Sequence, residues 1–298
     1  MSLAAGSTTI IQKIPPRQGS MLDPQSVDLV IYHENCSDGF AAAYSAWKLL
    51  GDKAEYYPAK YGSHPPNVEG KTVVILDFSY NNATTKKMIA EAKSLLVIDH
   101  HKSAMTELHD ITCTHFDMNQ SGAMLAWKFF HPSKEAPRLI KLIEDRDLWR
   151  WEIPYSREFS AAFDMVKFDF EEYEKFLADS EVDNAQARGA YILAYSETVI
   201  SKIAKNASPR RMGGKSVLVV NSPAWMSEIG NNLGLACDFA VVWYYDHRSM
   251  QVKVSLRAYH DDTDVSEIAK KFGGGGHRKA AGFSLPAGLS IESIFDRS

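Results

Sequence analysis

An Asp-His-His triplet at the end of an apolar run is the strongest candidate for chemistry in this sequence. Residues 95–98 are apolar and lead directly into Asp99, His100 and His101, which is typical of a buried parallel strand that ends in polar side chains. In open α/β sheets, ligands bind beyond the carboxyl ends of the strands. One triplet alone proves little, because isolated Asp and His residues after strands mostly form turns or lie on the surface.

Two further apolar runs place polar side chains at their ends in the same manner. The run DLVIYH ends on His33 and is followed by Cys36 and Asp38, while the run TVVILDF carries Asp77 near its end. Because the carboxyl ends of parallel strands lie along one edge of a sheet, we expect these side chains to converge on the triplet. This joint placement favours a functional site over a set of unrelated turn residues.

The converging side chains are carboxylates and imidazoles, which suit Mn²⁺ or Mg²⁺ better than a thiolate zinc site would. Two such ions about 4 Å apart can clamp the attacking and leaving oxygens of a phosphoryl displacement. Asp77 is expected on the middle strand of the three and is the best candidate to bridge both ions. The expected set is His33, Asp38, Asp77, Asp99, His100, His101 and Asp145.

A glycine-rich segment near the C-terminus suggests an anion site. Residues 273–276 are four consecutive glycines, followed by His277 and Arg278. Glycine lets backbone N–H groups approach an anion closely, and the two following side chains add charge or hydrogen-bond donors. Arg257 ends a predicted strand and can grip a phosphate with two parallel hydrogen bonds. The alternative for Arg257 is an ordinary surface salt bridge.

The order of the predicted elements indicates an α/β protein. Strands alternate with helices from residue 28, which implies right-handed crossovers and a parallel sheet. The predicted strands of this sheet are 28–33, 54–59 at an edge, 72–78, 95–101 and 111–116. The C-terminal part reads as a smaller α/β domain with a mixed sheet, in which the strands 238–246 and 250–259 are close enough to form a hairpin.

Four segments are expected along the chain. They are a flexible N-terminal tail at 1–22, a metal-binding catalytic domain at 23–181, a helical connector at 182–208 and a substrate-binding domain at 209–298. The tail contains Lys13, Arg17 and no acid, but Pro15 and Pro16 interrupt it. We therefore favour a flexible tail over a transit-like leader.

Composition limits the classes of function. The 298 residues include 33 Lys and Arg and 37 Asp and Glu, which gives a net charge of −4. This excludes the general basic field of proteins that bind long duplexes but leaves short or small anionic substrates. Cys36, Cys113 and Cys237 are few and scattered, which favours a reducing, cytoplasmic compartment over a disulfide framework. No apolar run reaches the length of a membrane span.

These motifs, in this order, resemble the DHH phosphoesterase superfamily, in the branch with a DHH-associated C-terminal domain. The resemblance covers about residues 28–285. The triplet matches the name-giving motif, and HENCSDGFAAA, LDFSY and EDRDLW match the first, second and fourth motifs. The C-terminal signature stands as GGGGHRKAAGF.

The resemblance implies a role for each candidate residue. One ion would be held by His33, the residue at position 36 and Asp77, while Asp99 would orient the histidines and His101 would face the scissile phosphate. The implied ligands of the second ion are Asp38, Asp77, His100 and Asp145. The residues implied to contact the terminal phosphate or nucleotide are Arg257, Gly275, Gly276 and His277.

The sequence departs from the family pattern at one position and is ambiguous at another. Cys36 stands where many members carry an Asp, so it is either a soft ligand of an altered first ion or a buried residue without metal contact. In EDRDLW, Asp145 fits the family spacing better than Asp147. The other Asp would pair with Arg146 or Arg150 or cap a turn.

The resemblance implies a metal-dependent phosphodiesterase with two Mn²⁺ ions, or Mg²⁺, in a cleft between the domains. The expected partner is a short single-stranded oligonucleotide or a small nucleotide phosphoester, with no membrane partner, and a homodimer is an alternative to a monomer. One alternative function is that of an exopolyphosphatase or pyrophosphatase. The other is a nucleotide-binding sensor whose metal site is degenerate at Cys36.

Overall fold

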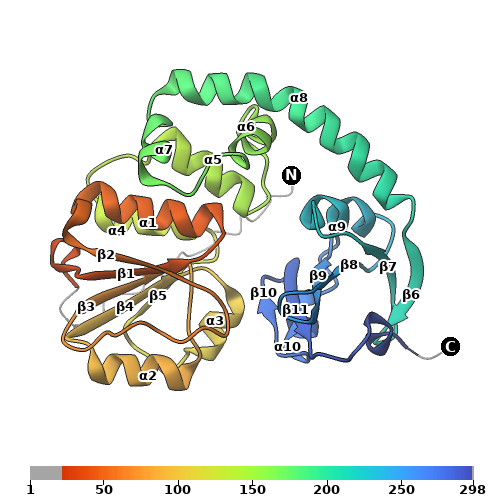
Figure 1. Ribbon diagram of the computed structural model, residues 1–298, viewed down its shortest axis with the longest axis horizontal. Helices are drawn as coiled ribbons and strands as arrows, with labels where there is room; N and C mark the ends of the chain where they lie inside the picture. Colours follow the sequence, from red (N-terminus) through yellow and green to blue (C-terminus); the bar gives the residue numbers. More distant parts are fainter. Residues whose placement is uncertain (1–21, 297–298) are drawn as a thin grey trace, which may run out of the picture.

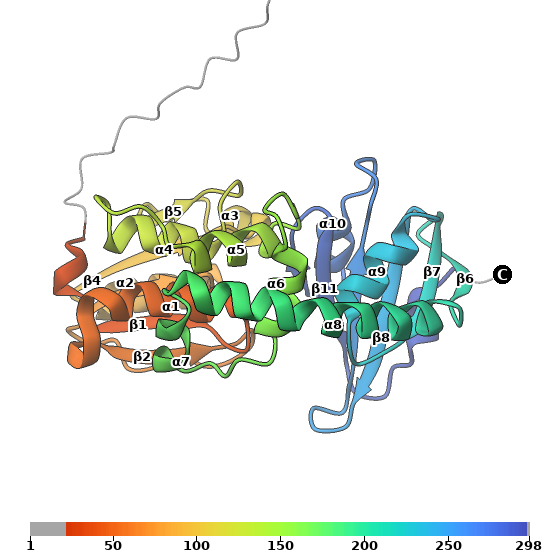
Figure 2. The same cartoon turned by 90° about the horizontal axis from the view of Figure 1, so that it is seen from above.

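The computed structural model describes residues 22–296, which form two sheet-containing parts joined by one long helix. Figure 1 shows the two parts facing each other, with the long helix arching over the space between them. The view from above in Figure 2 shows that this helix passes from the first part across the second. The predicted tail lies outside the described residues, apart from Leu22.

The first part is built on a five-stranded sheet in the order β2-β1-β3-β4-β5, and all of its pairings are parallel. The strands are β1 (Leu29–His33), β2 (Glu55–Ala59), β3 (Thr72–Leu76), β4 (Ser94–Asp99) and β5 (Thr114–Phe116). The prediction of a parallel sheet with 54–59 at its edge is confirmed. β3 lies between β1 and β4, as expected for the strand that leads into Asp77.

Helices cover both faces of this sheet because its central strands are apolar throughout. α1 (Ser37–Leu50) and α4 (Gly122–Phe130) pack on one face, and α2 (Asn82–Glu91) packs on the other (Figure 1). A short helix that we did not predict, α3 (Lys102–Glu107), begins directly after the triplet. Two 3₁₀ segments, Pro24–Ser26 and Gly51–Lys53, complete the connections.

A helical layer extends the first part toward the second. It contains α5 (Arg138–Asp147), α6 (Ser156–Phe163), α7 (Phe170–Lys175) and α8 (Asp179–Ala204). Their apolar side chains form one buried cluster with α1 and α4. α8 is the connecting helix, and the predicted boundaries after residues 181 and 208 fall within α8 and within the strand that follows it. The division into domains itself stays a prediction.

The second part contains a six-stranded sheet in the order β10-β11-β9-β8-β7-β6. β7 and β8 are parallel and the other neighbours are antiparallel, so the predicted mixed sheet and the β8–β9 hairpin are confirmed. The elements are β6 (Ser208–Met212), β7 (Lys215–Asn221), α9 (Met226–Gly234), β8 (Phe239–Asp246), β9 (Gln251–Arg257), α10 (Val265–Lys270), β10 (Gly275–Gly276), β11 (Ala280–Leu285) and the 3₁₀ segment Ile291–Ile294.

The sequence did not predict β6, and its composition explains why. The segment contains Pro209, Arg210 and Arg211, three residues that carry no apolar strand signal. Because β6 lies at the edge of the sheet, proline and exposed charges are tolerated there. Within residues 22–296, no helix combines the length and the apolar character needed to cross a bilayer.

Candidate metal-binding active site

The candidate residues meet at the carboxyl edge of the five-stranded sheet. His33 is the last residue of β1, Asp99 is the last of β4, and Asp77 follows β3 directly. Asp38 comes from the first turn of α1, the helix that follows β1. The next residue is Gly39, where a Cβ atom would overlap the backbone of His33. Glycine there lets α1 begin close enough to β1 to bring Asp38 to the edge.

The first cluster consists of His33, Cys36 and Asp77. One potential ligand atom from each lies within 4.8 Å of the other two. His33 Nδ1 is 3.5 Å from Asp77 Oδ2. The structure therefore brings the Cys36 thiol together with an imidazole and a carboxylate, which is the arrangement required if Cys36 is a soft ligand.

The second cluster consists of Asp38, His100 and Asp147, again with potential ligand atoms within 4.8 Å of one another. His100 Nε2 lies 3.6 Å from Asp38 Oδ2 and 3.5 Å from Asp147 Oδ2. It also lies 3.0 Å from Asp77 Oδ1. The two oxygens of Asp77 thus face different clusters, which is the position expected for a bridging carboxylate.

The structure places Asp147, and not the expected Asp145, beside the second cluster. Two residues apart on α5, the side chains point to opposite sides of the helix, so only one can face His100. That residue is Asp147. The buried Asp145 carboxylate instead accepts backbone N–H groups from Glu152 at 2.9 Å and from Ile153 at 3.4 Å. Asp145 therefore shapes the loop that follows α5.

Asp38 is held by the start of α4, a contact that sequence reasoning missed. The backbone N–H groups of Gly122 and Ala123 donate to its two oxygens at 2.6 and 3.0 Å. Helix N-termini stabilise negative charge in this way. Ser121 caps the same helix through Met124 N–H, a signal that does reveal a helix start in the sequence but not the carboxylate it receives.

Several polar atoms of the two clusters are buried without a hydrogen-bond partner among the described residues. These atoms are His33 Nδ1, Asp77 Oδ1, Asp77 Oδ2, His100 Nδ1 and Asp147 Oδ2. Buried polar groups without partners are costly, and such a set at one edge calls for an explanation. The carboxylate oxygens and His33 Nδ1, together with His100 Nε2, face the two clusters, and atoms of these kinds are the ligands that divalent cations take. The residues present therefore fit metal ions.

The charges of the clusters lead to the same conclusion. Burial, followed by the nearby Asp147 and Asp77 carboxylates, raises the pKa of Asp38 well above its usual value. Burial alone would lower the pKa of His100, but Asp147 and Asp77 raise it well above its usual value. Neighbouring carboxylates contribute to both shifts, and bound cations would neutralise their negative charge.

Asp99 and His101 form a tightly connected pair beside the clusters. Asp99 Oδ1 accepts the backbone N–H groups of His100 and His101 and lies 2.7 Å from His101 Nδ1. Its other oxygen accepts the Ser79 hydroxyl at 2.7 Å. With these partners the carboxylate fixes the orientation of the His101 ring, as the resemblance implied for Asp99.

The C-terminal part brings His277 directly to the triplet. Its ring stacks on His101 with centroids 4.7 Å apart and lies 4.8 Å from the ring of His100. Burial, together with His101 and His100, lowers the pKa of His277 to about 3. His277 is therefore a neutral side chain in this arrangement, able to donate or accept one hydrogen bond at each nitrogen.

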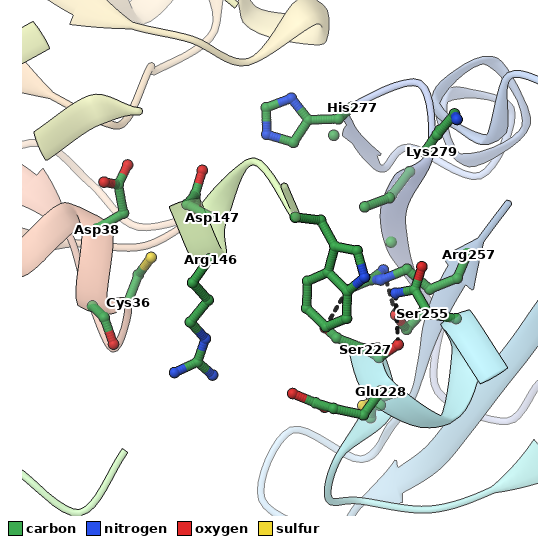
Figure 3. Close-up of a pocket in the computed structure, with 18 of the residues that line it drawn as sticks. Cys36, Asp38, Arg146, Asp147, Ser227, Glu228, Ser255, Arg257, His277 and Lys279 are labelled. Carbon is green, nitrogen blue, oxygen red and sulfur yellow. Dashed lines mark hydrogen bonds between the residues drawn. The ribbon is translucent and has the colours of Figure 1, made fainter. Parts of the chain in front are cut away.

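A cleft of about 2840 Å³ runs between the two parts. Its volume exceeds the roughly 300–1,000 Å³ of ordinary small-molecule pockets, so it can admit a substrate longer than one small molecule. Figure 3 shows the clusters and the C-terminal residues on opposite sides of this space. The labelled side chains are Cys36, Asp38, Arg146 and Asp147 on one side, and Ser227, Glu228, Ser255, Arg257, His277 and Lys279 on the other.

Arg257 lines the cleft, and neighbouring polar groups hold its side chain in place. Its guanidinium donates to Ser227 Oγ at 2.7 Å and to Ser255 Oγ at 2.8 Å (Figure 3). Among the described residues it forms no ion pair, so the salt-bridge alternative is not what the structure shows. Burial lowers the pKa of Arg257 to about 10, which still leaves it charged at neutral pH.

The glycine-rich segment has a more structural role than we predicted. The Gly276 N–H, expected to face a phosphate, donates to Ser103 Oγ at 3.2 Å. Gly275 also lies against Ser103, because a Cβ atom at this glycine would come within 2.9 Å of the hydroxyl. At Gly274 a Cβ atom would overlap the neighbouring strand β11. The glycines thus allow β10 to pack closely against both β11 and α3.

An ion pair beside this contact joins the two parts. Lys102 Nζ lies 2.6 Å from Asp264 Oδ2, next to the Ser103–Gly276 hydrogen bond. We expect Lys102→Met to raise KM for the substrate about two- to fivefold with little change in kcat, because ion pairs near the surface contribute up to about 1 kcal/mol. The control is Lys86→Met, in which Lys86 of α2 loses an equally short pair with Asp110, in the turn after α3. Equal kinetics for both variants would contradict the prediction.

Comparison with known proteins supports the family resemblance. Residues 222–297 match the DHHA1 domain. The chain is 35% identical over 304 residues to the uncharacterized protein R106 of Acanthamoeba polyphaga mimivirus, covering 94% of this chain and 72% of that protein. It is 25% identical over 246 residues to oligoribonuclease NrnB of Bacillus subtilis, covering 71% of this chain but only 58% of NrnB.

Solved structures show the same fold at low sequence identity. RecJ of Thermus thermophilus in complex with Mn²⁺ matches with a TM-score of 0.52 and 14% identity, covering 89% of this chain and 50% of that one. An exopolyphosphatase-related protein of Bacteroides fragilis matches with a TM-score of 0.53 and 14% identity, covering 91% and 89%. The predicted α/β fold class is thereby confirmed. With its ordered motifs and these relatives, the chain belongs to the DHH superfamily and is a metal-dependent enzyme that hydrolyses phosphoester bonds.

Proposed function

We propose that the protein hydrolyses the phosphodiester bonds of short single-stranded oligonucleotides, or of small nucleotide phosphoesters, and releases mononucleotides. The observation that carries this proposal is the set of side chains that line the cleft. Acid and imidazole clusters lie on one side, and exposed aromatic side chains line the cleft. On the other side lies the Arg257 guanidinium, which two serine hydroxyls hold and which forms no ion pair among the described residues. Such a cleft offers contacts for phosphates and for bases.

The clusters assign the metal ligands within this proposal. His33, Cys36 and Asp77 would hold one ion, and the second would be held by Asp38, Asp77, His100 and Asp147. We propose Mn²⁺, with Mg²⁺ as the alternative; the related RecJ structure is a complex with Mn²⁺. Bound divalent cations would supply Lewis-acid stabilisation of the phosphoryl oxygens and would activate water.

The other residues would bind and orient the substrate. Asp99 holds His101 through its Nδ1, which leaves Nε2 of the ring to contact the scissile phosphate or the leaving oxygen. Arg257 is held by two serine hydroxyls and would grip a second phosphate across the cleft. His277, whose ring stacks on that of His101, would line the site between the scissile phosphate and the phosphate held by Arg257.

The aromatic lining favours a nucleotide over an inorganic polyphosphate. Several large exposed apolar side chains lie along the cleft, namely Tyr61, Met118, Met165, Phe168, Trp225, Leu235 and Tyr259. Bases stack on aromatic rings with a gain of about 1–3 kcal/mol each, whereas phosphate chains gain nothing from them. The exopolyphosphatase alternative therefore stands second, although a related protein of Bacteroides fragilis carries that description.

Hydrolysis assays can separate these functions. We expect Mn²⁺-dependent release of mononucleotides from short single-stranded RNA or DNA, no activity after chelation, and little release of phosphate from polyphosphate. Preferred hydrolysis of polyphosphate would overturn the proposal in favour of a phosphoanhydride hydrolase. Tight nucleotide binding without hydrolysis of any phosphoester would favour a sensor. A cytoplasmic location, where short oligonucleotides arise during RNA turnover, belongs to this proposal.

A further inference from the structure

One aromatic side chain beside the first cluster, that of Tyr61, is largely exposed. Tyr61 lines the cleft and retains 60% of its possible exposure. It lies on the loop between β2 and β3, next to the edge of the sheet that carries His33 and Asp77. Single exposed rings are common on protein surfaces, so exposure alone assigns Tyr61 no role. What distinguishes Tyr61 is its position in the cleft, with its ring against the ring of His33.

The loop holds the ring in place before any partner arrives. Residues 60–63 form a turn in which the Ser63 N–H donates to Lys60 O at 3.0 Å. Gly62 has φ of +84°, the conformation required at the third position of a type II turn, and Tyr61 occupies the second. The Ser63 hydroxyl also donates to Lys60 O at 2.7 Å. The turn thus presents the tyrosine in a defined direction.

Aromatic contacts support the ring from beneath. Tyr61 lies 5.1 Å from the buried ring of Phe78, which in turn meets Tyr80 edge-on at 4.9 Å. The ring of His33 meets Tyr61 edge-on at 5.5 Å. Tyr61 is therefore fixed against a buried aromatic support and one metal-cluster imidazole while most of its surface faces the cleft. An aromatic side chain fixed in this way loses little entropy on binding.

We propose that Tyr61 is the stacking platform for the nucleobase next to the scissile phosphate. Direct ring contact with His33 places this platform within the reach of one nucleotide from the first cluster. The inference rests on the proposed function and adds to it the residue that distinguishes a nucleotide from a sugar phosphate or a polyphosphate. Stacking is tolerant of base identity, because every base presents a π face.

Binding of products tests the platform independently of turnover. AMP and ribose 5-phosphate are titrated calorimetrically into the Mn²⁺-loaded wild type and into three variants: Tyr61→Phe, Tyr61→Leu and Tyr191→Leu. Tyr191 is the matched control, because it is 83% exposed on α8 and does not line the cleft. We expect Tyr61→Leu to weaken AMP binding at least about fivefold, while Tyr61→Phe and Tyr191→Leu bind AMP like the wild type.

Ribose 5-phosphate provides the control for folding and for the phosphate contacts. Its affinity should change less than about twofold in all variants, because it has no base to stack. Equal AMP affinity in Tyr61→Leu and wild type, or equal weakening of both ligands, would overturn the platform. If the wild type hydrolyses no oligonucleotide but AMP binding still depends on Tyr61, the platform stands and the proposed catalytic function fails.

Discussion

Replacing Asp77 with Asn is expected to reduce metal-dependent hydrolysis by about 10³-fold or more while leaving the protein folded. The carboxylate faces both clusters, with Oδ2 toward His33 and Oδ1 toward His100, so its charge would serve both ions. Metal stabilisation of a phosphoryl transition state is worth several kcal/mol, and each 1.4 kcal/mol is a factor of ten in rate. Among the described residues of the two clusters, Asp77 presents one oxygen to His33 and the other to His100.

Asn is the suitable replacement for Asp77 because of the backbone conformation at this residue. Asp77 has φ of +53°, in the left-handed region that Asn tolerates but Ala does not. Gly122 packs so closely on Asp77 that a Cβ atom on the glycine would overlap it, so a larger side chain at residue 77 would also fail. Asp77→Asn keeps the shape and removes only the charge.

Two measurements check this prediction. Steady-state kinetics with Mn²⁺ should show the loss in kcat, and calorimetric titration of Mn²⁺ should show weakened binding at both clusters. Thermal unfolding without added metal should occur at a somewhat lower temperature. Burial alone would raise the pKa of Asp77, but His100 and His33 hold it below its usual value, so the charge removed in Asp77→Asn stabilises the fold. Retained activity with normal Mn²⁺ binding would rule out Asp77 as the bridging ligand.

The first sheet and most of its site could be predicted because the signals are local. Buried parallel strands read as continuous apolar runs, and the residue after each run lies at the carboxyl edge. His33, Asp77, Asp99 and His100 therefore come together from strand order alone. The enzyme class followed from the same ordered motifs.

Other features depend on contacts between residues that are far apart in the sequence, and local sequence patterns do not reveal such contacts. The contact of His277 with the triplet requires α8 to carry the second part back across the cleft, and the length of a helix does not give its direction. The contact between Asp38 and the start of α4 joins residues more than 80 positions apart. The contact between Gly276 and Ser103 could not be predicted either, because a glycine run gives the same sequence signal in an open loop and in a closely packed strand.

Asp147→Asn is expected to lower the catalytic rate, whereas Asp145→Asn is expected to lower the stability of the fold. Asp147 faces His100 across 3.5 Å and has a buried oxygen without a hydrogen bond, so its replacement should lower kcat by about 10²- to 10³-fold with normal thermal stability. Asp145 accepts two backbone N–H groups instead. In Asp145→Asn, the new amide group must meet one of these donors.

The expected result for Asp145→Asn is a loss of about 1–3 kcal/mol in the free energy of unfolding, because a buried backbone donor loses its acceptor. The loop after α5 depends on this carboxylate, and Trp149 and Trp151 within it hold left-handed backbone conformations that need external support. Denaturant unfolding and kinetics of both variants, measured below the unfolding transition, check the assignment. If Asp145→Asn lost activity at full stability and Asp147→Asn did not, the metal ligand would be Asp145, as the motif spacing alone suggested.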